Sequence, residues 1–234
     1  MKGKELQELV CAANLELARS GLVFSTWGNV SGIDRADGVM WIKPSGVPYD
    51  QLTPEKIVPV SLETGEPLQK DWRPSSDTPT HLELYRNWPQ IGGIVHTHSL
   101  YATAWAQAGK SIPCLGTTHA DDFFGAIPCT RRLNPQEVDQ NYEQNTGKVI
   151  VETFSDLKLD PLQRPGILVN GHGPFSWGKD PHEAVHKAIV LEYIAKMAFL
   201  TLQINKETSP LEEYLLQKHF LRKHGPDAYY GQDK

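Results

Sequence analysis

The stretch GGIVHTHSL at residues 92–100 ends an apolar run in two histidines that lie one residue apart. If residues 93–98 form a β-strand, the alternation of side chains sends Ile94, His96 and His98 to one face and Val95 and Thr97 to the other. Both imidazoles then point into the same space. Such a pair can hold a metal ion, but alone it is more typical of ordinary polar residues at a sheet edge.

A third histidine completes a candidate metal site. LVNGHGPFSWG at residues 168–178 ends another apolar strand at His172, between Gly171 and Gly173. These glycines would let a backbone turn pass close to a bound ion, although they also fit a plain hairpin. Catalytic zinc usually takes about three protein ligands and leaves a position for water or substrate. Three imidazoles therefore favour a metal site more strongly than any one of them.

The other histidines carry weaker signals. The spacings of His81, His186 and His224 predict solvated helix faces and no metal role. His119 precedes the acidic pair Asp121-Asp122, so we expect it to support a site or the fold without binding a metal directly.

Three segments combine small and hydroxyl-bearing residues beside apolar runs: TWGNVSG (26–32), IKPSGV (42–47) and RPSSDTPTH (73–81). Turns of this composition expose N–H groups and hydroxyls that can surround a phosphate, and Lys43 adds positive charge. Each could also be a simple hairpin turn. Their number in one half of the chain favours an anionic small ligand, with Asp77 directly after Ser75-Ser76.

Composition limits the partners. The chain has 234 residues, of which 39% are hydrophobic and 22% charged, with a net charge of −5. We expect one domain over residues 1–234, no nucleic-acid or membrane partner, and a cytoplasmic location, since neither a leader nor a membrane-length apolar segment is evident. The three cysteines are widely spaced and are expected to be packing residues.

The pattern of elements predicts an α/β fold. Strands are expected at residues 22–27, 38–44, 56–62, 93–98 and 166–170, and helices at 6–20, 78–88, 99–109 and 147–157. Capping boxes at residues 180–183 and 209–212 predict a long helix and a last helix. Without a strict βαβ rhythm, we expect a largely antiparallel central sheet covered by helices on both faces.

Longer motifs carry a family resemblance. TWGNVS, KPSG, PSSDTPTH, GGIVHTHS, GTTHAD, IPCTR, HGPFSWGKD, KHFLRKHG and AYYGQ resemble the L-ribulose-5-phosphate 4-epimerases of the class II aldolase superfamily. The resemblance runs nearly end to end. HTHS is shared with the fuculose-phosphate aldolases, whereas GTTHAD and AYYGQ are typical of the epimerases.

The resemblance implies a function and a set of site residues. It implies zinc-dependent epimerisation at C4 between L-ribulose 5-phosphate and D-xylulose 5-phosphate, in arabinose or ascorbate catabolism, by a cyclic homotetramer with active sites between subunits. The implied zinc ligands are Asp77, His96, His98 and His172, and the implied acid/base pair is Asp121 and Tyr230. The implied substrate-binding residues are Gly28, Asn29, Ser45, Gly46, Ser75 and Ser76, with Lys43 nearby.

One position departs from the family pattern. Asp122 stands where the epimerases tend to have tyrosine, so two carboxylates are adjacent. On an extended segment only one would point inward, and the motif favours Asp121.

Two other functions remain open on the sequence alone. A true aldolase would use the same metal ligands and release the two fragments. A non-catalytic interaction module, like the adducin head, would have no use for zinc, and the intact histidines speak against it.

Overall fold

The computed structural model describes residues 3–230. Six strands form one sheet in the order β3-β2-β1-β4-β6-β5, and all five strand pairings are antiparallel. The predicted antiparallel α/β fold is confirmed. The strands are β1 (Asn29–Asp34), β2 (Val39–Ile42), β3 (Val58–Ser61), β4 (Gly93–His96), β5 (Gly166–Leu168) and β6 (Pro174–Gly178).

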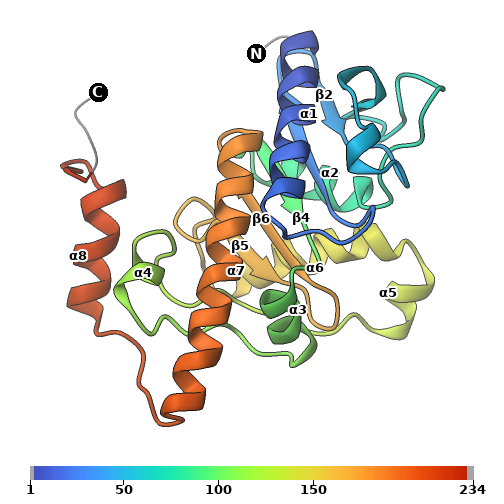
Figure 1. Cartoon of the computed structure of the whole chain (residues 1–234). Helices are drawn as coiled ribbons and strands as arrows, with labels where there is room; N and C mark the ends of the chain where they lie inside the picture. The colour runs from blue at the N-terminus through green and yellow to red at the C-terminus, as the bar shows by residue number, and fades with distance from the viewer. Residues whose placement is uncertain (1–2, 231–234) are drawn as a thin grey trace.

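Helices cover both faces of the sheet (Figure 1). The helices α1, α3 and α7 pack on one face, α2 and α6 lie together on the other, and α8 packs on α4, apart from the sheet. Their bounds are α1 (Gly3–Arg19), α2 (Thr78–Asn87), α3 (Leu100–Gln107), α4 (Thr117–Ala120), α5 (Pro135–Asp139), α6 (Tyr142–Asp156), α7 (Pro181–Ile204) and α8 (Glu213–His224). Two short 3₁₀ helices, η1 (Tyr49–Gln51) and η2 (Pro54–Lys56), precede β3.

Strand β4 divides its side chains between the two helical layers as the alternation predicts. Ile94 lies in the core cluster beneath α2 and α6, whereas Val95 packs with residues of α1 and α7. His96 ends the strand, two residues earlier than predicted, and His98 follows in a connection without regular structure. The sheet therefore delivers His96 from its α2/α6 face, at the end of a central strand.

One predicted element is wrong, and the start of another differs from the prediction. Residues 22–27 form a turn rather than a strand: Ser25 has a φ of 56°, and the strand begins later, at Asn29. The last helix begins at Glu213, without a side-chain cap, instead of at the capping box of residues 209–212. There the Leu211 N–H donates to the Cys114 carbonyl, which holds this segment against the loop before α4.

The predicted N-cap of α7 and the helix through residues 147–157 are present, although the Glu183 carboxylate accepts from the Lys179 N–H instead of completing a capping box with Asp180. The Asp180 carboxylate accepts a hydrogen bond from the Glu183 N–H, and α6 extends the second prediction back to Tyr142. The short helices α4 and α5 were not predicted, because elements of four and five residues have almost no periodic pattern.

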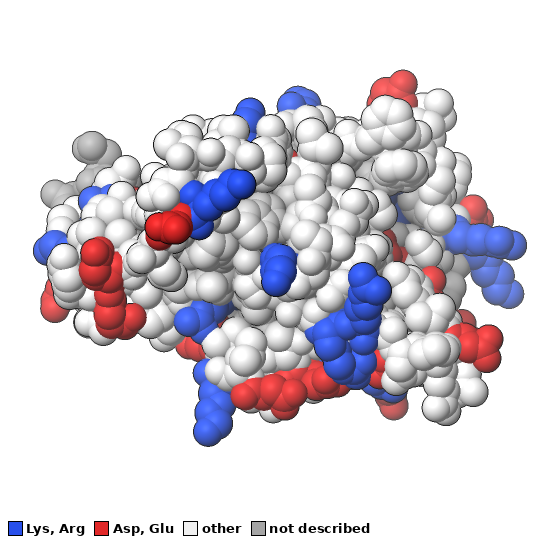
Figure 2. Space-filling model, turned by 90° about the horizontal axis from the view of Figure 1, so that it is seen from below, with Lys and Arg blue, Asp and Glu red and all other residues white. Residues whose placement is uncertain are grey.

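The surface agrees with the modest net charge. In the face of Figure 2, acidic and basic side chains lie among each other around a broad uncharged area, without a continuous basic patch. Within residues 3–230, no helix combines the length and apolar composition needed to cross a membrane.

Candidate metal site

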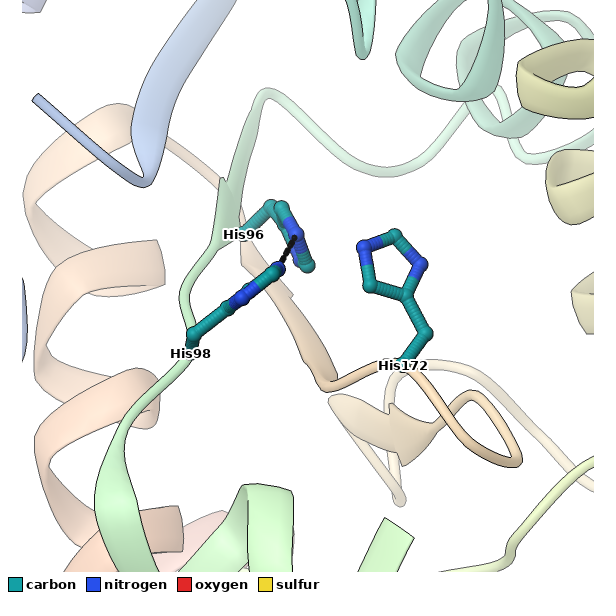
Figure 3. Close-up of side chains that lie close together, drawn as sticks. All are labelled: His96, His98 and His172. Carbon is teal, nitrogen blue, oxygen red and sulfur yellow. Dashed lines mark hydrogen bonds between the residues drawn. The ribbon is translucent and has the colours of Figure 1, made fainter. Parts of the chain in front are cut away.

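Three imidazoles from two strand ends meet at one point (Figure 3). His96 ends β4, His98 lies two residues beyond it, and His172 lies in the turn that joins β5 to β6. One nitrogen from each ring lies within 4.8 Å of the others. His172 does lie in a hairpin turn, and this turn brings the third imidazole to the other two, where the group could hold a metal ion.

The backbone fixes which nitrogen of His96 faces this group. The His96 Nδ1 lies 3.0 Å from the Pro174 carbonyl oxygen, which can only accept, so Nδ1 carries the proton and Nε2 keeps its lone pair. The His98 Nε2 lies 3.1 Å from that lone pair. Tetrahedral zinc with bonds of about 2.0–2.1 Å would separate two ligand nitrogens by about 3.3 Å, so the pair fits an ion without rearrangement.

A glycine makes this convergence possible. A Cβ at Gly173 would lie 2.7 Å from the Thr97 carbonyl oxygen and 3.4–3.5 Å from the rings of His98 and His96. Any side chain here would push the turn away from the end of β4.

Burial keeps the imidazoles in the form that binds metals. It lowers the pKa of His172 to about 3, with His96 and His98 adding to the effect, and it also lowers the pKa of His98. Neutral rings offer lone pairs, so no proton competes strongly for the site near neutral pH.

Asp77 lies at the edge of the imidazole group. It is the residue before α2, yet its carboxylate does not cap that helix. Its Oδ2 accepts a hydrogen bond of 2.7 Å from the Asn29 amide. Burial alone would raise the pKa of Asp77, but the neighbouring histidines and Asn29 outweigh burial and lower it, so the group is a carboxylate at neutral pH. The group of nitrogens within 4.8 Å does not include it.

The three imidazoles, here called the metal group because they could hold a metal ion, line a pocket of about 340 Å³. The four predicted metal ligands and the seven predicted substrate-binding residues all line it; the latter are Gly28, Asn29, Lys43, Ser45, Gly46, Ser75 and Ser76. The three donor-rich segments, distant in sequence, thus surround one space. In TWGNVSG, however, only residues 26–28 form a turn, because Asn29 already belongs to β1.

Lys43 also lines this pocket. Its side chain is almost fully buried, with Nζ 4.7 Å from the ring centre of Tyr49 and at 3.3 Å from the Thr26 carbonyl oxygen. Burial lowers the pKa of Lys43 to about 8. A poorly compensated ammonium at a pocket wall favours an anionic ligand.

The predicted acid/base pair lies in a second cluster, around α8. Asp121 accepts hydrogen bonds from Arg222 at 3.0 and 2.7 Å, and its Oδ1 lies 3.0 Å from His219 Nδ1. Arg222 also lies 4.9 Å from the ring centre of Tyr230. The structure thus brings Asp121 and Tyr230 together around Arg222, but neither lines the metal pocket of the same chain.

Asp122 belongs to a different ion pair. Its Oδ1 lies 2.8 Å from Nζ of Lys187, a nearly buried residue of α7. The expectation of one inward and one outward carboxylate is wrong, because this segment continues from helix α4 and is not extended. Asp121 joins α4 mainly to α8 and Asp122 joins α4 mainly to α7, while Lys223 of α8 lies 3.6 Å from both carboxylates.

Comparison with known proteins assigns the fold. Residues 8–199 match the model of the class II aldolase and adducin N-terminal domain family. The chain belongs to this family. Among solved structures it is similar to an L-fuculose 1-phosphate aldolase, with a TM-score of 0.78 and 21% identity over 94% of this chain and 96% of that one.

A second class II aldolase-like structure comes from Klebsiella pneumoniae. This protein, YgbL, is described as a candidate aldolase/epimerase/decarboxylase, and the match has a TM-score of 0.73 and 24% identity over 93% of this chain and 99% of that one. An L-fuculose 1-phosphate aldolase from Glaciozyma antarctica matches with a TM-score of 0.75 and 19% identity, over 96% and 84%. At these identities the likeness concerns the fold.

Within this class II aldolase domain, some residues near the sites carried no predicted role. His219 and Arg222 lie on one face of α8 by their spacing of three, a signal that the motif KHFLRKHG contains. The prediction that His81 is solvated is wrong: the ring is fully buried against the sheet, 6.0 Å from the ring of Phe175, and its Nδ1 lies 2.7 Å from the Ser31 hydroxyl. Helix α2 packs on two sides, so a prediction that assumes one buried face and one solvated face fails for it. His119 is structural, since its Nε2 lies 2.8 Å from the Gly125 carbonyl.

The site makes a prediction about metal binding. Replacing His98 with Asn should lower metal affinity by more than the roughly 10–100-fold typical for loss of a group that merely supports a ligand. Metal analysis after dialysis against a graded chelator measures this, with His182→Asn on α7 as the control. Equal metal retention in both variants would contradict the assignment.

Proposed function

We propose that this protein is a zinc-dependent epimerase that interconverts L-ribulose 5-phosphate and D-xylulose 5-phosphate. The observation that carries the proposal is the single pocket in which three imidazoles and a carboxylate face a wall of backbone and hydroxyl donors with a buried lysine. Such a pocket suits a small ligand with a phosphate at one end and metal-binding oxygens at the other. The GTTHAD and AYYGQ motifs favour the epimerases; the last two residues of AYYGQ lie outside the described residues.

The chemistry explains the need for a Lewis acid. In a 2-ketose the C4 hydrogen is not α to the carbonyl, so removing it directly is unfavourable. Breaking C3–C4 in a retro-aldol step instead leaves a dihydroxyacetone enediolate and glycolaldehyde phosphate. Rotation of the aldehyde and re-formation of the bond invert C4. A bound zinc ion would stabilise negative charge on the ketone-derived oxygens.

The residues of this chain would hold the two fragments. Ser75, Ser76 and the turn at Ser45-Gly46 would donate to the phosphate, and the Lys43 ammonium would offset its charge. Asn29 would keep the Asp77 carboxylate turned toward the imidazoles, as its hydrogen bond does here.

Proton transfer would fall to the second cluster. The ion pair with Arg222 lowers the pKa of Asp121, so this carboxylate is a weak base on its own. Asp121 orients the ring of His219. Through His219, Asp121 could still move a proton at the C4 oxygen. Tyr230 has Arg222 and Lys223 at 4.9 and 4.8 Å from its ring centre, and these contacts hold the phenol in the same cluster as Asp121. We place this cluster at the metal pocket of a neighbouring subunit in a cytoplasmic homotetramer.

An aldolase is the second candidate, because the structurally similar proteins include two L-fuculose 1-phosphate aldolases. It would use the same metal group and release both fragments. An adducin-like interaction module is disfavoured by the converging imidazoles.

Substrate conversion tests the function. Zinc-loaded protein should form D-xylulose 5-phosphate from L-ribulose 5-phosphate in a coupled assay, and Ser76→Ala should also release or accept glycolaldehyde phosphate, so that condensation with dihydroxyacetone becomes detectable. Cleavage of L-fuculose 1-phosphate without epimerisation would favour the aldolase instead. Absence of both activities in metal-loaded protein would contradict catalysis by this pocket.

Anion binding should follow the charge of Lys43. The ammonium is present below its pKa of about 8 and lost above it. Sulfate keeps its charge over this range, so its dissociation constant should be flat below pH 8 and then rise, approaching about tenfold per pH unit. Lys43→Met should remove the dependence and Lys56→Met should keep it. A flat wild-type profile from pH 7 to 10 would overturn the role of Lys43.

Mixed assemblies test the proposed sharing of active sites. His98→Asn and Tyr230→Phe proteins, each inactive, are dissociated together and allowed to reassemble. If Tyr230 acts on a neighbouring subunit, some interfaces join an intact metal group to an intact tyrosine, and activity returns. Mixed assemblies that form, as judged by mass spectrometry, yet remain inactive would show that each site is built within one chain.

A further inference from the structure

An aromatic side chain stands beside the metal group without a role in the mechanism so far. Trp27 lines the same pocket as the three histidines, and its ring centre lies 5.8 Å from that of His98. It is 54% exposed. Phe24, which is 72% exposed, packs edge-on against it at 5.4 Å. An exposed aromatic pair at the mouth of a polar pocket has apolar surface available for a ligand.

The backbone beneath this pair is held firmly. The Tyr49 hydroxyl lies 3.0 Å from the Trp27 carbonyl oxygen and 2.8 Å from that of Gly28. Lys43 donates to the preceding carbonyl of Thr26. Gly28 has a φ of +79°, and a Cβ there would lie 3.0 Å from the His96 carbonyl oxygen, so the turn is in close contact with β4.

The left-handed Ser25 shows that the turn is determined by its surroundings. Its φ of 56° is uncommon for a residue other than glycine and persists only when neighbouring contacts impose it. The backbone that carries Trp27 is thus held by its surroundings, and its indole lies 5.8 Å from the ring of His98.

Position and chemistry together suggest a role. Gly28, the residue after Trp27, belongs to one of the donor-rich turns that line the pocket together with Ser45 and Ser75, but the Trp27 indole itself lies beside the ring of His98, a predicted metal ligand. It would therefore border the fragment derived from C1–C3 of the substrate, not the phosphate. After C3–C4 breaks, the electron pair of that bond resides in the enediolate, and the C4 hydroxyl proton has gone to the base.

The enediolate can then follow two routes. Attack of C3 on the rotated aldehyde re-forms the bond and gives the epimer. Proton transfer from water to C3 gives free dihydroxyacetone beside glycolaldehyde phosphate, which is net cleavage with no water consumed, since one proton is lost and one gained. Whether the enzyme epimerises or cleaves depends on how well water is kept from C3.

We propose that Trp27 is the positioning residue that keeps water from C3 and so makes epimerisation, rather than cleavage, the outcome. The indole forms an apolar wall over the C1–C3 fragment, and Phe24 supports its outer edge. The inference rests on the proposed retro-aldol function and adds to it the residue that selects between its two outcomes.

The test measures the ratio of cleavage to epimerisation rather than the rate of either reaction. L-ribulose 5-phosphate is supplied to zinc-loaded wild type, Trp27→Ala, Trp27→Phe and Trp72→Ala in D₂O, and released glycolaldehyde phosphate is compared with D-xylulose 5-phosphate. Trp72 is the matched control, because it is 36% exposed and does not line the pocket. Mass spectrometry follows deuterium in dihydroxyacetone, and metal content and assembly size are recorded for each protein.

Trp27→Ala should raise the ratio of cleavage to epimerisation by at least about tenfold, with one solvent deuterium in the dihydroxyacetone. Trp27→Phe should restore most of the wild-type ratio, and Trp72→Ala should leave it unchanged. These results, with metal content retained, support the proposal.

Four results would overturn it. If Trp27→Ala is slower but its ratio of cleavage to epimerisation is unchanged, the indole does not select between the two outcomes. A matching rise in Trp72→Ala would show a general effect of losing a tryptophan, and a smaller assembly with an unchanged ratio would assign Trp27 to a subunit contact. Wild type that cleaves or ignores the substrate without any epimerisation refutes the proposed function itself, and the inference falls with it.

Discussion

The hydrogen bond between His96 Nδ1 and the Pro174 carbonyl is the contact on which the site depends. It crosses from β4 to the first residue of β6, where the two strands pair next to the turn that carries His172. One contact therefore fixes the tautomer of His96, the direction of its lone pair and the distance of the third imidazole. The missing side chain at Gly173 allows the same approach. Because β4 lies between β1 and β6, the sheet itself sets this geometry.

The rest of the pocket follows from the neighbours of β4. Strand β1 brings Asn29 opposite His96, and Asn29 turns the Asp77 carboxylate away from capping α2. Because the Asp77 carboxylate does not cap α2, it is available to the site. By contrast, Asp121, Arg222 and Tyr230 gather where α8 stands apart from the sheet (Figure 1). The candidate metal-binding and anion-binding residues thus lie at the edge of the sheet, whereas the predicted acid/base residues lie around a peripheral helix, a division that suits the proposed site completed by a second subunit.

The sequence predicts those elements whose buried side chains are apolar and recur with the period of a strand or a helix. The central strand at GGIVHTH, the helices at α1, α2, α3 and α7, and the antiparallel α/β class all follow from apolar periodicity. Strand β1 escapes this reasoning because its buried residues include Asn29 and Ser31, so the strand does not look apolar. The Asn29 amide N–H donates to Asp77, and the Ser31 hydroxyl bonds to His81. The aromatic run before it resembles a strand but forms an exposed turn.

The composition of the three donor-rich segments predicts an anionic ligand, but the loops at residues 26–28, 44–46 and 74–77 have no local signal that they meet, so which of their residues share one pocket came from the resemblance. The ion pairs of Asp121 and Asp122 depend on helices far along the chain and on a short helix that periodicity does not detect. Long-range polar contacts of this kind leave no repeat in the sequence, which is why the role of the acidic pair needed the structure.

Coordination of one metal ion by three imidazoles is the central claim, and X-ray absorption at the zinc edge of the loaded protein tests it directly. The account predicts a first shell of nitrogen and oxygen at about 2.0–2.1 Å with outer-shell scattering from three imidazole rings, reduced to two rings in His172→Asn. A shell containing sulfur at about 2.3 Å, or one without imidazole scattering, would contradict it.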